Sequence, residues 1–333
     1  MKKVKVAVIG VGHLGTLHSK MFCQIKECEL VGVYDIDLEK AKAKAAEFKT
    51  KQFWSLEEVF DNCDAVSVVA TTSAHYEICK KAFEAKKDVF VEKPITANIS
   101  EAEELISLAE KNNLIFQVGH IERFNPAVMS LSNYKIEPMF IQSDRLSQFN
   151  PRGTDVAVVL DLMIHDIDLI LSFVKSEPVD IRASGVAVVS DHIDIANARI
   201  EFENGCVANV TASRISQKKM RKMRIFQKDA YIAIDFNAGV SEVFRLVKPE
   251  IVLSDPFVSF GEIGIGDKKR MVIYEQPEIK EINALKYELE MFIKSCLDRT
   301  PPIVSGSDGL KALKVANMIV AKIEESLKKA NLN

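Results

Sequence analysis

The fold is decided by residues 4–15, which read VKVAVIGVGHLG. Residues 4–9 form an almost continuous apolar run, which is typical of a strand buried on both faces of a parallel sheet. Gly10, Gly12 and Gly15 then give the pattern G-x-G-x-x-G, directly before a segment with helical periodicity. A strand, a glycine loop and a helix in this order predict a βαβ unit that binds a pyrophosphate at the positive end of its helix.

An acidic residue after the second predicted strand indicates which dinucleotide binds. Asp35 follows the run Leu30–Tyr34, where a carboxylate accepts hydrogen bonds from the adenosine ribose and repels a 2′-phosphate. No lysine or arginine follows before Lys40, so the sequence favours NAD over NADP. The alternative is that the glycines only shape a turn and Asp35 caps a helix. We disfavour it because strand, loop, helix and acid are all in register.

Apolar runs alternate with helical segments through the first third of the chain. The runs at 65–69, 89–91 and 115–118 predict further buried strands. One intervening helix is expected over Ser100–Asn112, with a capping box formed by Ser100 and Glu103. This alternation predicts a doubly wound parallel sheet, and hence an NAD-binding Rossmann domain over residues 1–121.

The pattern changes over residues 122–333, for which we expect a substrate-binding and oligomerisation domain of α/β type. Residues 196–202 alternate apolar and polar side chains, Asn204-Gly205 turns the chain, and 206–210 lead back, as in a hairpin. A second strand pair is expected at 222–227 and 231–236, so the sheet is predicted to be antiparallel. Two helices are expected to close the chain, and packing of the last one on the first domain is left open. Residues 254–269 are expected to form a loop.

Length and composition restrict the class of protein. A chain of 333 residues is expected to form two domains. A net charge of −3 excludes a global attraction to nucleic acid or to an anionic membrane, although a local basic patch stays open. The six cysteines form no C-x-x-C pair and no metal-like cluster, so we expect reduced thiols and no metal site. With no signal-peptide core or membrane span, a cytoplasmic location is predicted.

Three residues are candidates for chemistry. Lys93 follows the strand at 89–91, and the carboxyl ends of parallel strands border the ligand crevice of doubly wound folds. Asp161 and His165 are four residues apart at the start of a predicted helix, so the carboxylate can orient the imidazole as a general base. Each has a structural alternative: Lys93 as a surface lysine, Asp161 as a helix N-cap and His165 as a buried histidine. The glycine loop favours the catalytic reading.

Taken together, these motifs resemble the Gfo/Idh/MocA oxidoreductase family over essentially the whole chain. They are GVGHLG at 10–15, VEKP at 91–94 and DLMIHDID at 161–168. The resemblance implies a large open-faced, mostly antiparallel second sheet that builds a homodimer or homotetramer. It also implies that Lys93 is the catalytic lysine, that Asp161 and His165 are the acid/base pair, and that the Lys93–Pro94 bond is cis.

The resemblance extends the set of expected cofactor contacts. His75 matches a recurrent family histidine near the cofactor, and a structural hydrogen bond at a helix start is an equal alternative. His13 is either a cofactor contact or a solvated loop side chain, whereas His18 and His192 are interpreted as structural or solvated. The expected cofactor-binding residues are Gly10, Gly12, His13, Leu14, Gly15, Asp35, Thr71, His75, Glu92 and Lys93.

A finer resemblance concerns the substrate. The segments GHIERFNP (119–126), SDRLS (143–147), TASRIS (211–216) and IFQKDAYIAIDF (225–236) are similar to bacterial nucleotide-sugar 3-dehydrogenases that act on UDP-N-acetylglucosamine for amino-sugar lipid A. In that subgroup reading His165 takes the proton of the sugar 3-hydroxyl as hydride leaves C3, and Lys93 hydrogen-bonds the same oxygen. Candidates for substrate binding are Arg123, Asn125, Arg145, Arg152, Asp161 and His165, with Arg214 as a further diphosphate candidate.

Two other functions stay open. The DLMIHDID motif is especially close to the inositol dehydrogenase form, so a free sugar or an inositol is the alternative substrate. A non-catalytic NAD-sensing regulator is disfavoured because Lys93, Asp161 and His165 are all present. In each case the expected partner is a small molecule, not a nucleic acid or a membrane.

Overall fold

A computed structural model describes residues 3–150, 156–248 and 258–329, and the chain divides into two compact units. The first unit comprises the described residues up to Phe124 together with Ile282–Lys314. The second comprises the described residues of Asn125–Glu281 and those from Val315 onward. This grouping differs from the expected assignment of everything after residue 121 to one domain, because the segment from Ile282 to Lys314 is compact with the first unit.

A six-stranded sheet forms the centre of the first unit. Its strands pair in the order β3-β2-β1-β4-β5-β6, and every pairing is parallel. This is the strand order of a Rossmann fold, in which two halves meet between β1 and β4, and it confirms the predicted doubly wound sheet. The strands are β1 (Val4–Ile9), β2 (Cys28–Tyr34), β3 (Lys51–Gln52), β4 (Ala65–Val68), β5 (Asp88–Glu92) and β6 (Phe116–Gly119).

Helices join these strands, and one of them begins earlier than predicted. They are α1 (His13–Phe22), α2 (Leu38–Phe48), α3 (Leu56–Asn62), α4 (Thr72–Glu84), α5 (Ile99–Lys111) and the 3₁₀ helix η1 (Ile121–Phe124). The expected capping box of Ser100 and Glu103 is wrong. Helix α5 is capped by Asn98, whose backbone N–H donates to Glu101. Asparagine is a strong N-cap, so Ser100 falls inside the first turn.

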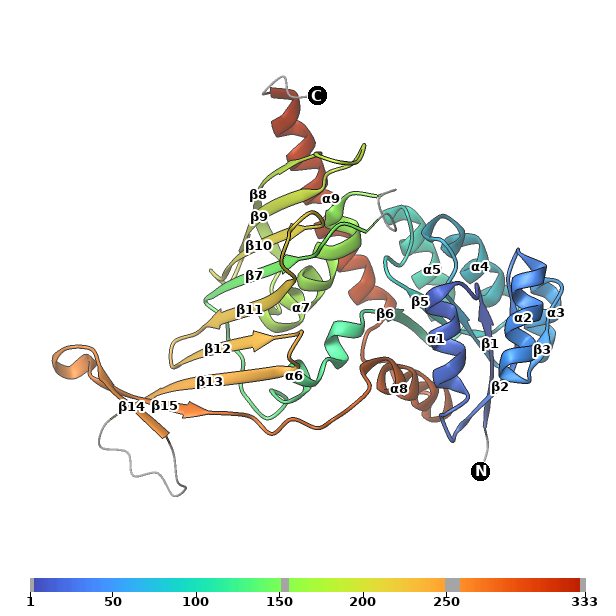
Figure 1. Ribbon diagram of the computed structural model, residues 1–333, viewed down its shortest axis with the longest axis horizontal. Helices are drawn as coiled ribbons and strands as arrows, with labels where there is room; N and C mark the ends of the chain where they lie inside the picture. Colours follow the sequence, from blue (N-terminus) through green and yellow to red (C-terminus); the bar gives the residue numbers. More distant parts are fainter. Residues whose placement is uncertain (1–2, 151–155, 249–257, 330–333) are drawn as a thin grey trace. The chain divides into compact units, whose positions relative to one another are not determined.

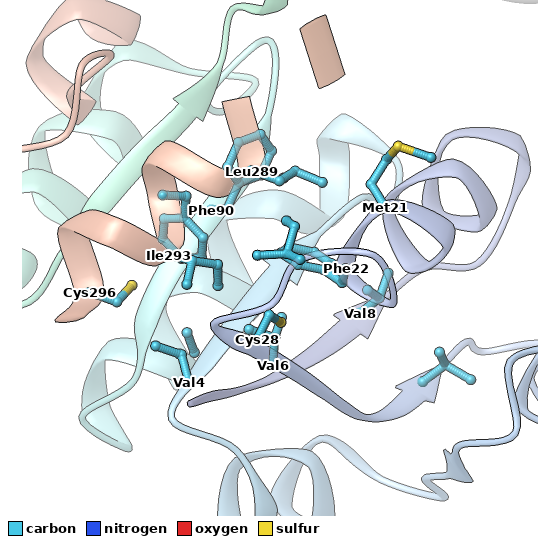
Figure 2. Close-up of a cluster of buried hydrophobic side chains, with 14 of the residues drawn as sticks. Val4, Val6, Val8, Met21, Phe22, Cys28, Phe90, Leu289, Ile293 and Cys296 are labelled. Carbon is cyan, nitrogen blue, oxygen red and sulfur yellow. The ribbon is translucent and has the colours of Figure 1, made fainter. Parts of the chain in front are cut away.

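The core of the first unit explains why a late helix belongs to it. Helix α8 (Ala284–Asp298) buries Leu289 and Ile293 in the same cluster as Val6 of β1 and Phe22 of α1 (Figure 2). All four side chains are nearly inaccessible to solvent. Each such apolar side chain contributes about 1.5–3 kcal/mol when fully buried. This burial anchors α8 against the parallel sheet.

A nine-stranded sheet forms the second unit, with the order β14-β15-β13-β12-β11-β7-β10-β9-β8 (Figure 1). Neighbouring strands are antiparallel except β7 and β10, which confirms the predicted mostly antiparallel sheet. The strands are β7 (Phe140–Leu146), β8 (Pro178–Val186), β9 (Ile195–Phe202), β10 (Val207–Ser213), β11 (Met220–Phe226), β12 (Ala230–Asp235), β13 (Val240–Val247), β14 (Val258–Ile263) and β15 (Arg270–Glu275).

One face of this sheet is covered by helix. On β9 the alternate residues from Ala196 to Phe202 are buried, as the period of two predicts. Helix α7 (Ile164–Val174), which follows the π-helical segment η2 (Val159–Met163), packs on β7 and β10. The remaining elements are α6 (Pro126–Met129), the 3₁₀ helix η3 (Gly266–Lys268) and α9 (Gly306–Lys329).

The expected loop over 254–269 is wrong in its second part. Residues 254–257 lie outside the described residues, but Val258–Ile263 forms β14, which pairs with β15. Its side chains are exposed throughout, so the strand carries no apolar alternation that sequence patterning detects. Within the described part of the chain, no helix is both long and apolar enough to cross a membrane.

Candidate active site

In the glycine loop between β1 and α1, two glycines stand where no side chain would fit. Gly10 has a φ of 89°, and an added Cβ would lie 2.8 Å from the backbone of Val69 and Ala70. A Cβ on Gly15 would lie 1.8 Å from the carbonyl oxygen of Gly10. Gly12 is different, because nothing lies within 4 Å of its added Cβ. Gly10 therefore packs against the backbone that follows β4, Gly15 packs against the loop itself, and Gly12 presents bare backbone.

A cavity of about 620 Å³ lies beside this loop. Its walls come from the loop, from the end of β2, from the segment between β4 and α4, and from residues of α1, α2, α3 and α4. The lining includes Gly10, Gly12, His13, Leu14, Tyr34, Asp35, Ile36, Lys40, Leu56, Val69, Ala70, Thr71, Ala74 and Ile78. Its volume falls in the range of small-molecule and cofactor sites. Apolar walls, the N-terminus of α1 and bare backbone at Gly12 suit a dinucleotide with an anionic pyrophosphate.

Asp35 is the acidic group of this cavity and is also tied to the glycine loop. One carboxylate oxygen, Oδ2, accepts the backbone N–H of Val11 at 2.8 Å, and Oδ1 accepts that of Asp37 at 3.0 Å. The nearest paired cation is Lys40, whose Nζ lies 4.0 Å from Oδ1. Asp35 is only 8% exposed, and these two backbone N–H groups fix the position of its carboxyl group at the end of β2.

His75 is not among the cavity-lining residues. Its contacts fit the structural alternative better than a direct contact between its ring and the cofactor. The side chain is buried, with Nδ1 2.9 Å from the carbonyl oxygen of Pro94 and Nε2 3.1 Å from that of Ala70. Burial lowers the pKa of His75, although these carbonyls oppose the shift. Since Ala70 lines the cavity, His75 stabilises this part of the cavity wall through its contact with the Ala70 carbonyl.

Lys93 follows β5, and the peptide bond to Pro94 is cis, as the family resemblance implies. The preceding residue, Glu92, accepts the backbone N–H of Lys93 at 3.2 Å. Its other carboxylate oxygen lies 3.0 Å from Nε2 of His18, a fully buried histidine on α1. Gly15, Glu92 and Lys93 are not among the cavity-lining residues. The interpretation of His18 as structural or solvated thus missed its pairing with Glu92, 74 positions later.

Asp161 and His165 lie in the second unit at a π-to-α junction. Asp161 is in η2, His165 is in the first turn of α7, and both are half-buried. Residues four apart lie on one side of a helix, so the junction keeps the two side chains on the same side. Single π turns inside helices are frequent at functional sites. This junction is therefore the strongest candidate site of the second unit.

Arg145 is the candidate that the structure removes from the diphosphate site. It is 2% exposed, and its guanidinium donates to Asp166 through Nε at 2.6 Å and Nη2 at 3.1 Å. Asp166 also accepts the hydroxyl of Ser143 at 3.0 Å. This buried pair ties α7 to β7, directly beside His165. An arginine whose charge is already neutralised in the core is not available to a phosphate.

The other substrate candidates divide between partnered and undescribed residues. Arg214 is buried and donates to the carbonyl oxygen of Val156 at 2.6 Å, which again indicates a structural role. Asn125 caps α6 by accepting the backbone N–H of Ala127 at 3.1 Å. Arg123 is half-buried, with its Nη2 3.7 Å from Asp308. Arg152 lies outside the described residues.

Comparison with known proteins places the chain in a family. Residues 4–120 match the model described as "Oxidoreductase family, NAD-binding Rossmann fold", and residues 134–233 match the GFO/IDH/MocA C-terminal domain. The UDP-N-acetylglucosamine 3-dehydrogenase of Acidithiobacillus ferrooxidans is 34% identical over 330 residues, covering 99% of this chain and 100% of that one. The chain belongs to the Gfo/Idh/MocA oxidoreductase family. It is therefore an oxidoreductase whose first unit is an NAD(P)-binding Rossmann domain.

Solved structures of Gfo/Idh/MocA relatives agree with the fold. That of the same Acidithiobacillus ferrooxidans enzyme superposes with a TM-score of 0.87 at 34% identity, covering 98% of this chain and 99% of that one. A more distant relative, the myo-inositol 2-dehydrogenase of Thermotoga maritima, is 24% identical over 341 residues and 97% of each chain. Enzymes named for a nucleotide sugar and for an inositol thus both align with at least 97% of the chain.

Proposed function

We propose that the chain is an NAD-dependent dehydrogenase that oxidises the C3 hydroxyl of UDP-N-acetylglucosamine or a related nucleotide sugar. The observation that carries the proposal is the 34% identity to a UDP-N-acetylglucosamine 3-dehydrogenase across the full length of both chains. In addition, Lys93, Asp161 and His165, which the family resemblance identifies as catalytic, are all present. These residues disfavour a non-catalytic, NAD-sensing role.

The choice of NAD over NADP rests on Asp35. Its buried carboxylate borders the cavity beside the glycine loop, where it suits ribose hydroxyls and repels a 2′-phosphate. When bound, the nicotinamide supplies the chemistry of hydride acceptance. The chain supplies the backbone at Gly12 and the N-terminus of α1 for the pyrophosphate, and apolar walls for the adenosine.

The catalytic work is proton transfer and charge stabilisation by the chain's own groups. His165 takes the proton of the sugar hydroxyl, and Asp161 orients its imidazole. Lys93 donates a hydrogen bond to the same oxygen and stabilises the negative charge that develops there.

The open face of the nine-stranded sheet is the proposed oligomer surface. Large apolar side chains are exposed along it, including Phe226 of β11 and Phe260 of β14. Exposed apolar patches of this kind mark interaction surfaces. A homodimer or homotetramer is the expected state, and light scattering coupled to gel filtration measures it directly.

An inositol is the second candidate substrate, because a myo-inositol 2-dehydrogenase aligns with 97% of the chain. The two proposals separate in one assay panel, in which NAD reduction is followed with UDP-N-acetylglucosamine, UDP-glucose, free N-acetylglucosamine, myo-inositol and scyllo-inositol. We expect turnover of the first compound at a kcat/KM at least about 100-fold above that of the inositols. Brisk turnover of an inositol with none of any UDP-sugar would reject the nucleotide-sugar proposal.

A further inference from the structure

Three polar side chains from separate elements of the first unit form a row, in which two are buried and the third is half-buried. His18 of α1 is inaccessible to solvent, and its Nδ1 lies 3.0 Å from Oγ of Ser67 on β4. Its Nε2 lies 3.0 Å from Oε1 of Glu92 at the end of β5. The imidazole also packs edge-on against Phe90, with ring centroids 5.4 Å apart. The ring is therefore fixed both by hydrogen bonds and by packing.

The proton positions in this row follow from the chemistry of the groups. An ionised carboxylate only accepts hydrogen bonds, so Nε2–H of His18 donates to Glu92. In a neutral ring Nδ1 is then free to accept the hydroxyl proton of Ser67. Burial by itself raises the pKa of Glu92, but the hydrogen bond from His18, together with the charge and backbone N–H of Lys93, outweighs it and lowers the pKa. Glu92 is thus held as a carboxylate.

Two further neighbours restrict the carboxylate of Glu92. Its Oε2 accepts the backbone N–H of Lys93 at 3.2 Å. On the neighbouring strand β6, a Cβ added to Gly119 would lie 3.0 Å from the carboxyl carbon. Any residue other than glycine there would press on the carboxylate. The backbone N–H of Lys93 is therefore bonded to a group that has little freedom to move.

A second buried histidine holds the chain on the other side of Lys93. The carbonyl oxygen of Pro94 lies 2.9 Å from Nδ1 of His75, and the same ring reaches Ala70 on the cavity wall. The short segment that carries Lys93 thus has an anchor before it and an anchor after it. Only the first anchor uses a carboxylate, and that carboxylate depends on His18.

We propose that His18 is a positioning residue for the reaction, which fixes the backbone of Lys93 through Glu92. The proposal rests on the proposed function in one respect, namely that Lys93 acts on the substrate oxygen. A lysine side chain has four rotatable bonds, so a displacement of its backbone changes where its ammonium group reaches. A misplacement of about 1 Å at a reacting group costs roughly 100-fold in rate. His18 is not among the cavity-lining residues, and its two ring nitrogens lie beside Ser67 and Glu92.

The test compares three variants of the full chain with NAD and the best substrate of the panel. His18→Phe keeps a ring of similar size but removes the donor to Glu92. We expect kcat to fall roughly 10- to 100-fold while the Kd for NAD stays within about threefold. His18→Gln restores an amide N–H near the position of Nε2, and we expect it to recover most of the lost kcat. Phe22→Leu, on the same helix and equally buried, is the control for lost packing.

A thermal melt of each variant separates positioning from folding. We expect His18→Phe and Phe22→Leu both to lower Tm, and only His18→Phe to lower kcat. Equal losses of kcat in the two variants, a parallel loss of NAD affinity, or no recovery in His18→Gln would overturn the proposal. If His18→Phe does not fold, Glu92→Gln provides the same test, since an amide accepts only one of the two N–H groups that the carboxylate accepts. Wild-type kcat in Glu92→Gln would then overturn it.

Crystal structures of wild type and His18→Phe keep this test separate from the substrate assignment. If the wild type oxidises none of the compounds in the panel, the proposed function fails, but the position of Lys93 is still measurable. We expect the Lys93 backbone and side chain to be displaced or disordered in His18→Phe and unchanged in Phe22→Leu. An unchanged Lys93 in the His18→Phe crystals would overturn the positioning role.

Discussion

Replacing Asp35 should change the choice between NAD and NADP by an amount that the structure allows us to work out. A carboxylate and one charge of a 2′-phosphate about 5 Å apart, at an effective dielectric constant of about 20, repel by about 3 kcal/mol. Lys40, 4.0 Å from Asp35 Oδ1, offsets part of this. We therefore expect Asp35→Ala to reduce the preference for NAD over NADP, measured as the ratio of their dissociation constants, roughly 10- to 150-fold. This change corresponds to a difference in binding free energy of about 1.4–3 kcal/mol.

The same change also weakens the glycine loop, so the affinity for NAD alone is an ambiguous measure. Asp35 accepts the backbone N–H groups of Val11 and Asp37, and losing two such bonds to a charged group costs about 3–6 kcal/mol. This loss weakens both dinucleotides, whereas the repulsion acts on NADP alone. Calorimetric titration of both cofactors into each variant therefore isolates the charge effect in the ratio.

Asp64→Ala is the matched control for this experiment. Asp64 also accepts a backbone N–H, that of Lys5 at 2.9 Å, but it precedes β4 and does not line the cavity. We expect its loss to lower stability and to leave the NAD to NADP ratio unchanged. An unchanged ratio in Asp35→Ala, or an equal change in Asp64→Ala, would refute the assignment of Asp35 as the residue that reads the ribose.

Three further outcomes are expected. In Gly15→Ala the new Cβ would lie 1.8 Å from the carbonyl oxygen of Gly10. We expect this clash to lower the free energy of unfolding by about 3 kcal/mol and the calorimetric affinity for NAD roughly 100-fold. Wild-type affinity would contradict the loop geometry. His165→Ala should lower kcat roughly 100- to 10,000-fold with NAD affinity retained, and an unchanged kcat would dismiss it as the base. Burial opposes ionisation of Asp194, but three backbone N–H groups and a serine hydroxyl lower its pKa to about 2. The ionised carboxylate therefore stabilises the fold above its unfolded pKa of about 3.9, and this stabilisation is lost as the pH falls toward 2. We expect Asp194→Asn to lower the free energy of unfolding in urea by about 1–3 kcal/mol at pH 7 and by much less near pH 2.

The first unit was accessible from sequence because its signals are local. The strand at Val4–Ile9, the glycine loop and Asp35 lie within a short stretch, and each reports its own backbone geometry or burial. The two-residue strand β3 (Lys51–Gln52) was missed, since it is too short to show any hydrophobic period. Helix α8 is one of the two helices predicted to close the chain, but the sequence does not indicate which sheet it covers.

The candidate site exposes the same limit. Nothing near His18 in the sequence indicates a partner, because Glu92 is 74 positions away and meets it only through the packing of α1 on the parallel sheet. Arg145 was a reasonable phosphate candidate by residue type, yet Asp166 neutralises it in the core. Residue type and local spacing predict which groups are capable of chemistry. Long-range pairing decides which of them are already occupied by the fold.

The most direct test of the proposed reaction follows one hydrogen atom. UDP-N-acetylglucosamine carrying deuterium at C3 is incubated with the protein and NAD, and the reduced cofactor is analysed by mass spectrometry. We predict that the NADH formed carries the deuterium and that Lys93→Ala forms almost none while binding NAD as the wild type does. Reduced cofactor without deuterium, or no reduction of NAD by this sugar at all, would contradict oxidation at C3.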